Sequence, residues 1–144
     1  MKRQMLPIIL TLLVGMIILQ CTSNKQEQMN QKPSVIPQPQ AVETYNATFT
    51  IGPSTKIVIE ENSPEIKSVA DFFASQLEQR SGLMPEITSE ETAGAIRLAL
   101  SDTINGDEAY ALRVDENAAV ISASAAPGLF YGMQSFLQLM PVKA

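Results

Sequence analysis

Near the C-terminus the chain reads GLFYGMQSFLQLMP, residues 128–141. Large apolar side chains recur there at helical spacing, and they are Leu129, Phe130, Met133, Phe136, Leu137 and Met140. Pro127 is preset for the first turn of a helix, whereas Pro141 cannot continue one, so the two prolines bound the segment. The pattern predicts an amphipathic helix whose apolar stripe, with its aromatic side chains, packs against a core. Gly132 predicts close packing of backbone inside this helix.

A second amphipathic helix is predicted between Ser63 and Ser81. The Ser63 hydroxyl can cap free backbone N–H groups, Pro64 fits a first helical turn, and Gly82 fits a C-terminal cap. Its apolar side chains form one stripe, widened by Phe72, that consists of Ile66, Val69, Ala70, Phe73 and Leu77. Each helix therefore has one apolar stripe to bury, and one apolar surface beneath the two helices can cover both stripes.

The segments between and before the helices alternate apolar and polar residues with period two, which predicts strands. They are residues 47–51, 55–60, 95–101, 110–114 and 119–124, of which the last two form a hairpin around residues 115–117. The predicted fold is α+β, a mixed β-sheet with two amphipathic helices packed on one face. One domain, residues 41–144, is long enough to bury its own core.

The N-terminus predicts export. Lys2 and Arg3 precede an apolar, uncharged run, and Cys21, the one cysteine of the chain, follows it. This arrangement is typical of a bacterial lipoprotein signal peptide, residues 1–20, with Cys21 as the lipid attachment site. An uncleaved N-terminal anchor with a buried thiol is the alternative. Residues 21–40 are rich in Gln, Asn, Ser and Pro and predict a polar tether. The expected location is the bacterial cell envelope, membrane-anchored, at the outer membrane.

Composition excludes several classes of function. The chain contains no histidine, which removes Ser-His-Asp and Cys-His nucleophile systems and most transition-metal sites. Its net charge of -5 argues against nucleic acid as a partner. The adjacent acidic pairs Glu90-Glu91 and Asp107-Glu108 lie between polar neighbours, so solvated turns are predicted rather than an acid/base couple. No metal site or cofactor is predicted. Without tryptophan, the tyrosines at positions 45, 110 and 131 are the candidates for stacking on a sugar.

Three stretches together carry a family resemblance. Residues 35–40 read VIPQPQ, residues 108–114 read EAYALRV, and residues 128–132 read GLFYG. In order and spacing, over residues 33–142, they resemble the non-catalytic N-terminal (domain 2-like) domain of bacterial glycoside hydrolase family 20, the β-N-acetylhexosaminidases. Family 84 hexosaminidases and α-glucuronidases have a similar leading domain and stay as alternatives.

The resemblance places catalysis outside this stretch of chain. In family 20 a neighbouring Asp-Glu pair at the mouth of a (β/α)8 barrel works with the 2-acetamido group of the substrate. A barrel takes about 250 residues, so the catalytic barrel is expected to be absent here and no residue is assigned a catalytic role. Whether the chain is itself an enzyme is left open. The implied partner is a catalytic barrel, in the same or another chain.

Two functions are therefore weighed. The first is a lipid-anchored supporting domain, a fragment or truncation, of a β-N-acetylhexosaminidase that acts on terminal N-acetylhexosamine residues of glycans. The second is a free-standing envelope lipoprotein that binds glycans or a partner protein, without catalysis, through the stripe a barrel would cover.

Overall fold

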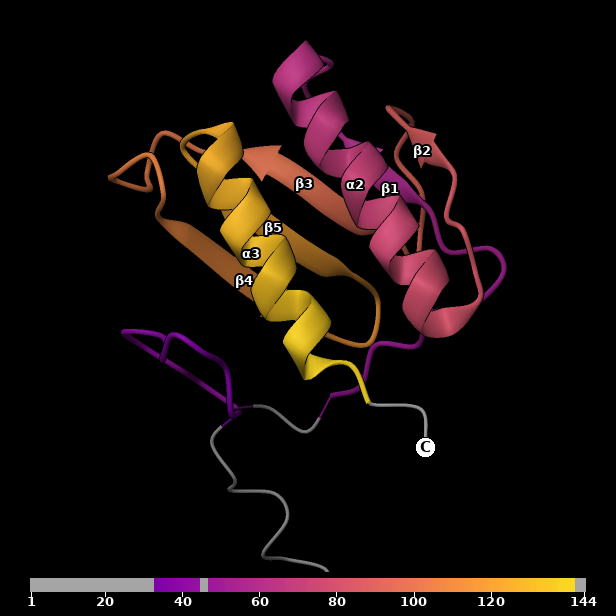
Figure 1. Ribbon diagram of the computed structural model, residues 1–144, viewed down its shortest axis with the longest axis horizontal. Helices are drawn as coiled ribbons and strands as arrows, with labels where there is room; N and C mark the ends of the chain where they lie inside the picture. The colour runs from indigo at the N-terminus through magenta and orange to yellow at the C-terminus, as the bar shows by residue number, and fades with distance from the viewer. Residues whose placement is uncertain (1–32, 45–46, 142–144) are drawn as a thin grey trace, which may run out of the picture. The chain divides into compact units, whose positions relative to one another are not determined.

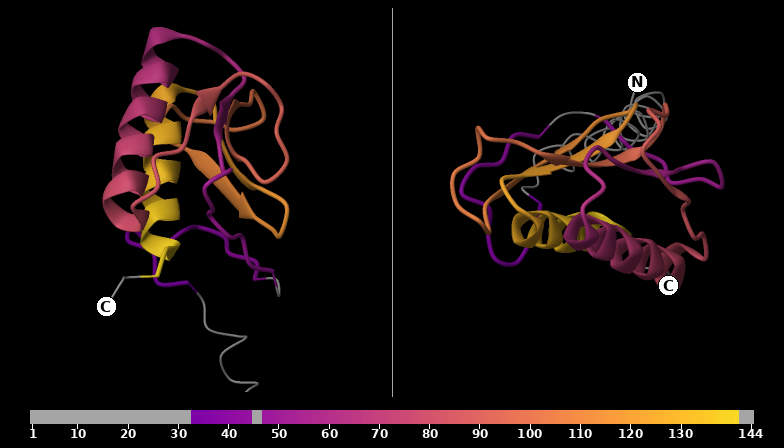
Figure 2. Two further views of the ribbon diagram at one scale, coloured as in Figure 1. Left: turned by 90° about the vertical axis from the view of Figure 1, so that its right-hand side faces the viewer. Right: turned by 90° about the horizontal axis from the view of Figure 1, so that it is seen from above.

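The computed structural model describes residues 33–44 and 47–141. A five-stranded sheet forms one layer and two helices form the other (Figure 1). The helices are α2, Pro64–Ser81, and α3, Ala126–Leu139. Figure 2 shows both on the same face of the sheet. The predicted α+β fold, a mixed sheet with two helices on one face, is confirmed.

The sheet has the strand order β2-β1-β3-β5-β4. Its strands are β1 (Ile57–Ile59), β2 (Ile87–Thr88), β3 (Ile96–Leu100), β4 (Tyr110–Val114) and β5 (Ala119–Ala123). β1 is parallel to both β2 and β3, and β3 is parallel to β5. β4 and β5 form the predicted antiparallel hairpin, with Leu112 opposite Ile121. The internal strand β1 is entirely apolar, and its three residues are buried.

Helix α2 begins and ends where its sequence signals predict. The Ser63 hydroxyl accepts a hydrogen bond from the N–H of Ile66 at 3.3 Å. Gly82 adopts a left-handed conformation, with φ of 77°, and its N–H donates to the carbonyl of Glu78. A residue with a side chain is strained at such a φ, so glycine suits this cap.

The core lies between the helix layer and the sheet. Alternate strand residues point toward the helices, as period two requires. The largest fully buried side chains include Phe73 and Leu77 from α2, Ile96 and Ile121 from the sheet, and Leu129, Met133 and Leu137 from α3. Phe73 and Phe136 meet edge to face, with ring centroids 5.6 Å apart. Aromatic side chains thus join the two helices inside the core.

Three predictions from apolar spacing are wrong. Residues 47–51 form no strand, although Phe49 and Ile51 pack against the core as partly buried side chains. Phe72 and Phe130 do not lie in the buried stripes of their helices and are exposed. Apolar side chains can be satisfied by packing alone, without the ladder of hydrogen bonds that defines a strand.

The leading segment, residues 33–44, contacts the helix layer. Val35 is buried and Ile36 pairs with Gln138 of α3. Residues 33–40, predicted as the end of a tether, are part of the same compact unit as the sheet. No helix within residues 33–44 and 47–141 is long and apolar enough to span a membrane.

Candidate functional site

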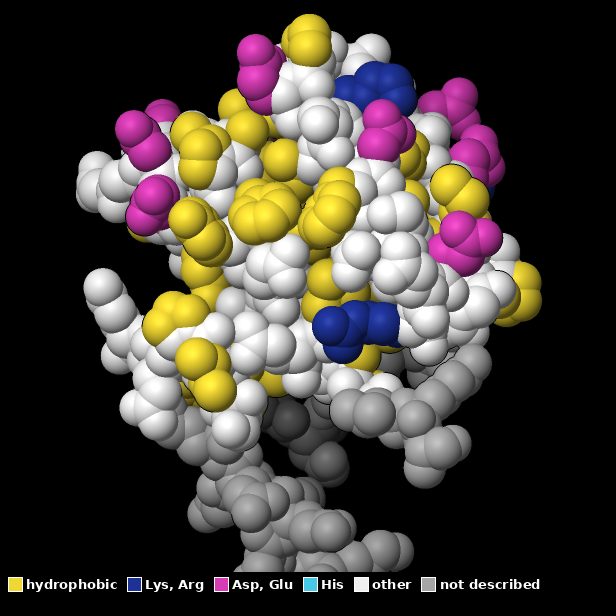
Figure 3. All heavy atoms as spheres, in the orientation of Figure 1, with side chains coloured by type: hydrophobic (Ala, Val, Ile, Leu, Met, Phe, Trp, Pro, Cys, Tyr) yellow, Lys and Arg dark blue, Asp and Glu magenta, His cyan; other side chains and the backbone are white. Residues whose placement is uncertain are grey.

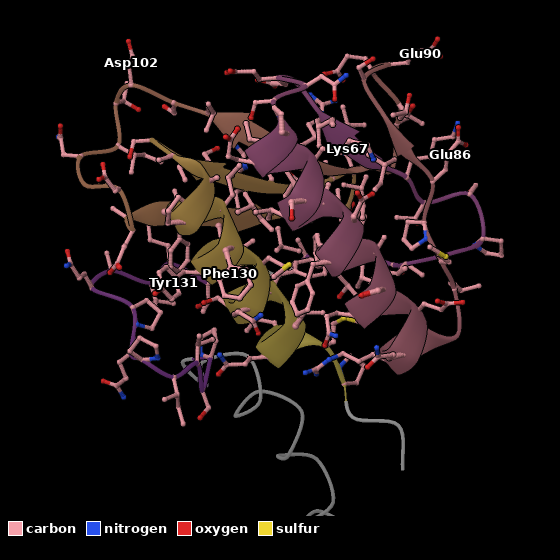
Figure 4. The ribbon with its side chains drawn as sticks, turned by 45° about the horizontal axis from the view of Figure 1, so that its top comes forward. Lys67, Glu86, Glu90, Asp102, Phe130 and Tyr131 are labelled. Atoms are coloured by element: carbon pink, nitrogen blue, oxygen red, sulfur yellow. The ribbon has the colours of Figure 1, made fainter. Side chains whose placement is uncertain are left out.

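The most distinctive surface feature is an aromatic cluster on the helix layer, formed by Phe72 of α2 and by Phe130 and Tyr131 of α3. These side chains are 43%, 37% and 43% exposed. The Phe72 and Phe130 rings have centroids 5.8 Å apart, and Phe130 and Tyr131 meet edge to face at 5.9 Å. Figure 3 shows hydrophobic side chains gathered over the helices, and Figure 4 shows Phe130 and Tyr131 next to each other on α3.

Small residues on the opposite side of α3 explain why these aromatic side chains are exposed. A Cβ at Gly132 would overlap Cγ2 of Ile121, and one at Gly128 would lie 2.8 Å from Cβ of Ala123. The helix therefore touches β5 through its glycines, and its backbone lies close to the sheet. With that side fixed, the positions of Phe130 and Tyr131 turn away from the sheet.

A hydrogen bond in the core fixes the rotation of α3. The hydroxyls of Tyr110, on β4, and Ser135, on α3, lie 2.5 Å apart. Ser135 is buried, and a buried hydroxyl without a partner is costly, so this pair favours one register of helix on sheet. Tyr110 is thus assigned to the core rather than to sugar stacking.

The last turn of α3 is held on two sides. Arg80, in the last turn of α2, donates from Nη1 to the carbonyl oxygen of Leu137 at 3.1 Å. A cation at the C-terminal end of a helix also favours the helix dipole. On the other side, the Gln138 amide contacts the backbone of Ile36. The end of α3 is consequently tied both to α2 and to the leading segment.

The acidic pairs named from the sequence do not converge on a site. Glu90, Glu91, Asp107 and Glu108 are all exposed, and Glu91 forms an ion pair with Arg97. Figure 4 shows Glu86 and Glu90 away from Tyr131. Asp102 lies apart from the two glutamates. Among the described residues no group of three or more His, Cys, Asp or Glu could hold a metal ion.

Two charged groups outside the cluster have shifted pKa values. The pKa of Lys56 is raised by its hydrogen bond to Glu86 and by the charge of that carboxylate. The pKa of Asp115 is lowered because it accepts backbone N–H groups of Asn117 and Ala118. Asp115 closes the β4–β5 turn and Lys56 joins β1 to the segment before β2, so both groups serve the sheet.

Sequence reasoning finds some parts of this surface and misses others. The predicted signal peptide, Cys21 and Tyr45 lie outside the described residues. The sequence identifies Gly132 as a close-packing position, whereas it predicts neither the Phe72–Phe130 contact nor the Gln138 contact. The pair Phe130 and Tyr131 carries no local signal of its exposure, because another consecutive pair of the same helix, Phe136 and Leu137, is buried.

The arrangement suits contact with another protein surface. The cluster offers ring faces and edges and has one polar group, the Tyr131 hydroxyl, whereas a site for a small polar ligand has several polar groups that converge on it. Exposed aromatic side chains in one patch are typical of protein–protein or domain–domain contacts.

Comparisons with known proteins identify the family of this chain. Residues 32–144 match the family model described as glycosyl hydrolase family 20, domain 2. A beta-hexosaminidase of Porphyromonas gingivalis is 30% identical over 113 residues, and a beta-N-acetylhexosaminidase of Cellulomonas fimi is 33% identical over 99 residues. These alignments cover 76% and 67% of this chain.

A solved structure is similar as well. The family 20 beta-N-acetylhexosaminidase of Streptomyces coelicolor A3(2) superposes with a TM-score of 0.69 at 37% identity, over 74% of this chain. The chain spans 14% and 20% of the lengths of the two sequence relatives and 21% of this solved chain. The chain belongs to glycosyl hydrolase family 20, and the part that it matches is domain 2 of that family.

Proposed function

We propose that this chain is the supporting, non-catalytic leading domain of a β-N-acetylhexosaminidase. The proposal rests on the match of residues 32–144 to domain 2 of family 20. The chain also spans only about a fifth or less of the length of its relatives. The substrates would be glycans with terminal N-acetylhexosamine, as the names of the relatives suggest. Catalysis would lie in a barrel joined to this domain.

The aromatic cluster is the surface that we assign to the barrel. Phe72, Phe130 and Tyr131 form one apolar patch on the outer side of the helix layer. Covering them would remove apolar area from water, which is favourable at about 25 cal/mol per Å². Because Gly132 and the Tyr110–Ser135 bond hold α3 to the sheet, the patch is a rigid platform. Rigid platforms cost little ordering entropy on binding.

Hydrolysis of a chromogenic N-acetylglucosaminide tests this function. The native protein, immunoprecipitated from its cells with an antibody to residues 33–141, is expected to hydrolyse the substrate. The 144-residue chain alone is expected to stay at background. Turnover by the 144-residue chain would overturn the supporting role, and an inactive native protein would overturn the hexosaminidase assignment.

The same proposal includes a lipid anchor at Cys21 in the bacterial cell envelope. Its support is the sequence: a short apolar run after Lys2 and Arg3, then one cysteine and a polar stretch. Metabolic labelling with an alkyne fatty acid is expected to mark the chain and to leave it in the membrane fraction. Cys21→Ala should abolish the label, whereas the matched control Ser23→Ala should keep it. A labelled Cys21→Ala variant would contradict the anchor.

A further inference from the structure

One side chain of α3 pairs with the backbone of a residue 102 positions away. The N–H of Ile36 donates to Oε1 of Gln138 at 2.8 Å, and Nε2 of Gln138 donates to the carbonyl oxygen of Ile36 at 3.0 Å. Both backbone polar groups of Ile36 are thereby satisfied by one amide, as a neighbouring strand would satisfy them. The two bonds also fix which end of the Gln138 amide is oxygen.

The neighbouring residue adds an apolar contact. Val35 is only 4% exposed, while Ile36 is 78% exposed. The leading segment therefore turns one side chain inward and leaves the next outside. The buried Val35 and the amide pair hold the segment at two adjacent residues, so we expect opening at Ile36 to be a local event that leaves the sheet intact.

The turn that carries Gln138 is itself held firmly. Leu137 is buried, and its carbonyl accepts a hydrogen bond from Arg80 of α2. Figure 1 shows the leading segment passing near the lower end of α3, where the described chain also ends. Residues at opposite ends of the domain sequence thus meet at one place.

We propose that Gln138 is a positioning residue that clamps the leading segment to the last turn of α3. Through this clamp, whatever precedes Pro33 and whatever follows α3 are joined to the domain at the same end. The position of Pro33 relative to the last turn of α3 is then set by the clamp rather than by a free linker. The clamp needs neither a lipid anchor nor a barrel, so it stands apart from the proposed function.

Amide hydrogen exchange in the 144-residue chain tests the clamp. Gln138→Met keeps an unbranched side chain and good helix propensity but removes both hydrogen bonds. The Ile36 amide is expected to exchange at least about tenfold faster in this variant. The matched control is Gln134→Met, one turn earlier on α3, which should leave Ile36 unchanged. Amides of β3 and β5 should be unaffected in both variants.

A second measurement reports position rather than stability. A nitroxide at Ser34→Cys, with Cys21→Ser to leave one thiol, should broaden the amide resonance of Leu139. Gln138→Met should remove this broadening and Gln134→Met should keep it. If broadening persists in Gln138→Met, or if Ile36 exchanges there as in the parent, the clamp is overturned.

A third variant covers the case in which Gln138→Met loosens the whole domain. Gln138→Lys keeps a donor for the Ile36 carbonyl but has no acceptor for the Ile36 N–H. Faster exchange at Ile36, with β3 and β5 amides unchanged, would support the clamp. Equal acceleration at Ile36 and in the sheet would overturn it.

Discussion

At Gly132 a single added carbon would decide how closely α3 can lie on the sheet. In a Gly132→Ala variant the new methyl would overlap Cγ2 of Ile121 and press on the Tyr110 ring. Alanine is the better helix former by about 1 kcal/mol, but overpacking in a tight core costs about 1–3 kcal/mol. Because the overlap is with a strand side chain, we expect the cost to exceed the gain and the free energy of unfolding, measured by urea denaturation, to fall by up to about 2 kcal/mol.

Gly52→Ala is the matched control for this prediction. A Cβ added at Gly52 would have no other heavy atom within 4 Å, and the φ of Gly52 is not positive. Its substitution should change stability by no more than about 0.5 kcal/mol. Equal stability of Gly132→Ala and Gly52→Ala would show that α3 can shift away from β5 without cost.

Asp115 provides a pH-dependent contribution to stability. Its folded pKa is lowered from 3.8 by the N–H groups of Asn117 and Ala118. The unfolded chain therefore takes up the proton first as the pH falls. The contribution is complete above the unfolded pKa and is lost as the pH falls through the folded pKa. Asp115→Asn should be less stable than the parent at neutral pH, and this gap should close in acid.

Urea unfolding of parent and variant between pH 7 and pH 2 measures this gap. Glu116→Gln is the control, since Glu116 lies in the same turn and is exposed. A gap between Asp115→Asn and the parent that does not change with pH would contradict the assignment of the ionised carboxylate.

Single residues also show why part of the site is not predictable. The predicted stripe of α3 rests on large apolar side chains, and so places Phe130 in the core. The structure instead seats the helix on Gly128, Gly132 and Ser135, which are small enough for close approach. Hydrophobicity scales give such residues little weight, although they decide which side of the helix touches the sheet.

At the scale of elements, the N-terminal cap of α2 is a local signal with a measurable effect. Ser63→Ala removes the hydroxyl that accepts from the Ile66 N–H, and this should cost about 1 kcal/mol. Ser75→Ala is the control within the same helix, because the Ser75 hydroxyl only bonds the carbonyl of Phe72. Thermal unfolding of the two variants should separate them, with Ser63→Ala melting lower. Matching melting temperatures would mean that the cap contributes nothing.

The helices and the hairpin are predictable because their signals are local. Ser63 and Gly82 bound α2, and Asp115 closes the turn between β4 and β5. Residues 47–51 carry the same alternation but form no strand, since a strand also needs a partner with free backbone groups. The order of the parallel strands depends on contacts between distant residues and cannot be derived from spacing.

At the scale of the whole domain, the aromatic cluster should govern how the 144-residue chain behaves in solution. Exposed aromatic patches favour dye binding and self-association. The double variant Phe72→Gln and Phe130→Gln should bind less hydrophobic dye and stay monomeric at higher concentration, as measured by fluorescence and sedimentation. Because both rings are already partly exposed, its stability should fall by only about 1–2 kcal/mol.

Met84→Gln is the control for the cluster. Met84 is 65% exposed and lies in the loop after α2, outside the cluster. The Met84→Gln variant should self-associate and bind dye as the parent does. If Met84→Gln lowered dye binding and self-association as much as the double variant did, general surface hydrophobicity would explain both properties.

The hydrogen bond between Tyr110 and Ser135 also has a spectroscopic consequence. The chain has no tryptophan and three tyrosines, so tyrosine dominates its near-ultraviolet absorption. Of the two tyrosines in the described residues, Tyr131 is exposed, whereas Tyr110 is fixed between β4 and α3. Near-ultraviolet circular dichroism therefore reports whether α3 is seated, while the far-ultraviolet signal reports whether it is helical. A state in which the first signal vanishes before the second would be a helix layer detached from its sheet.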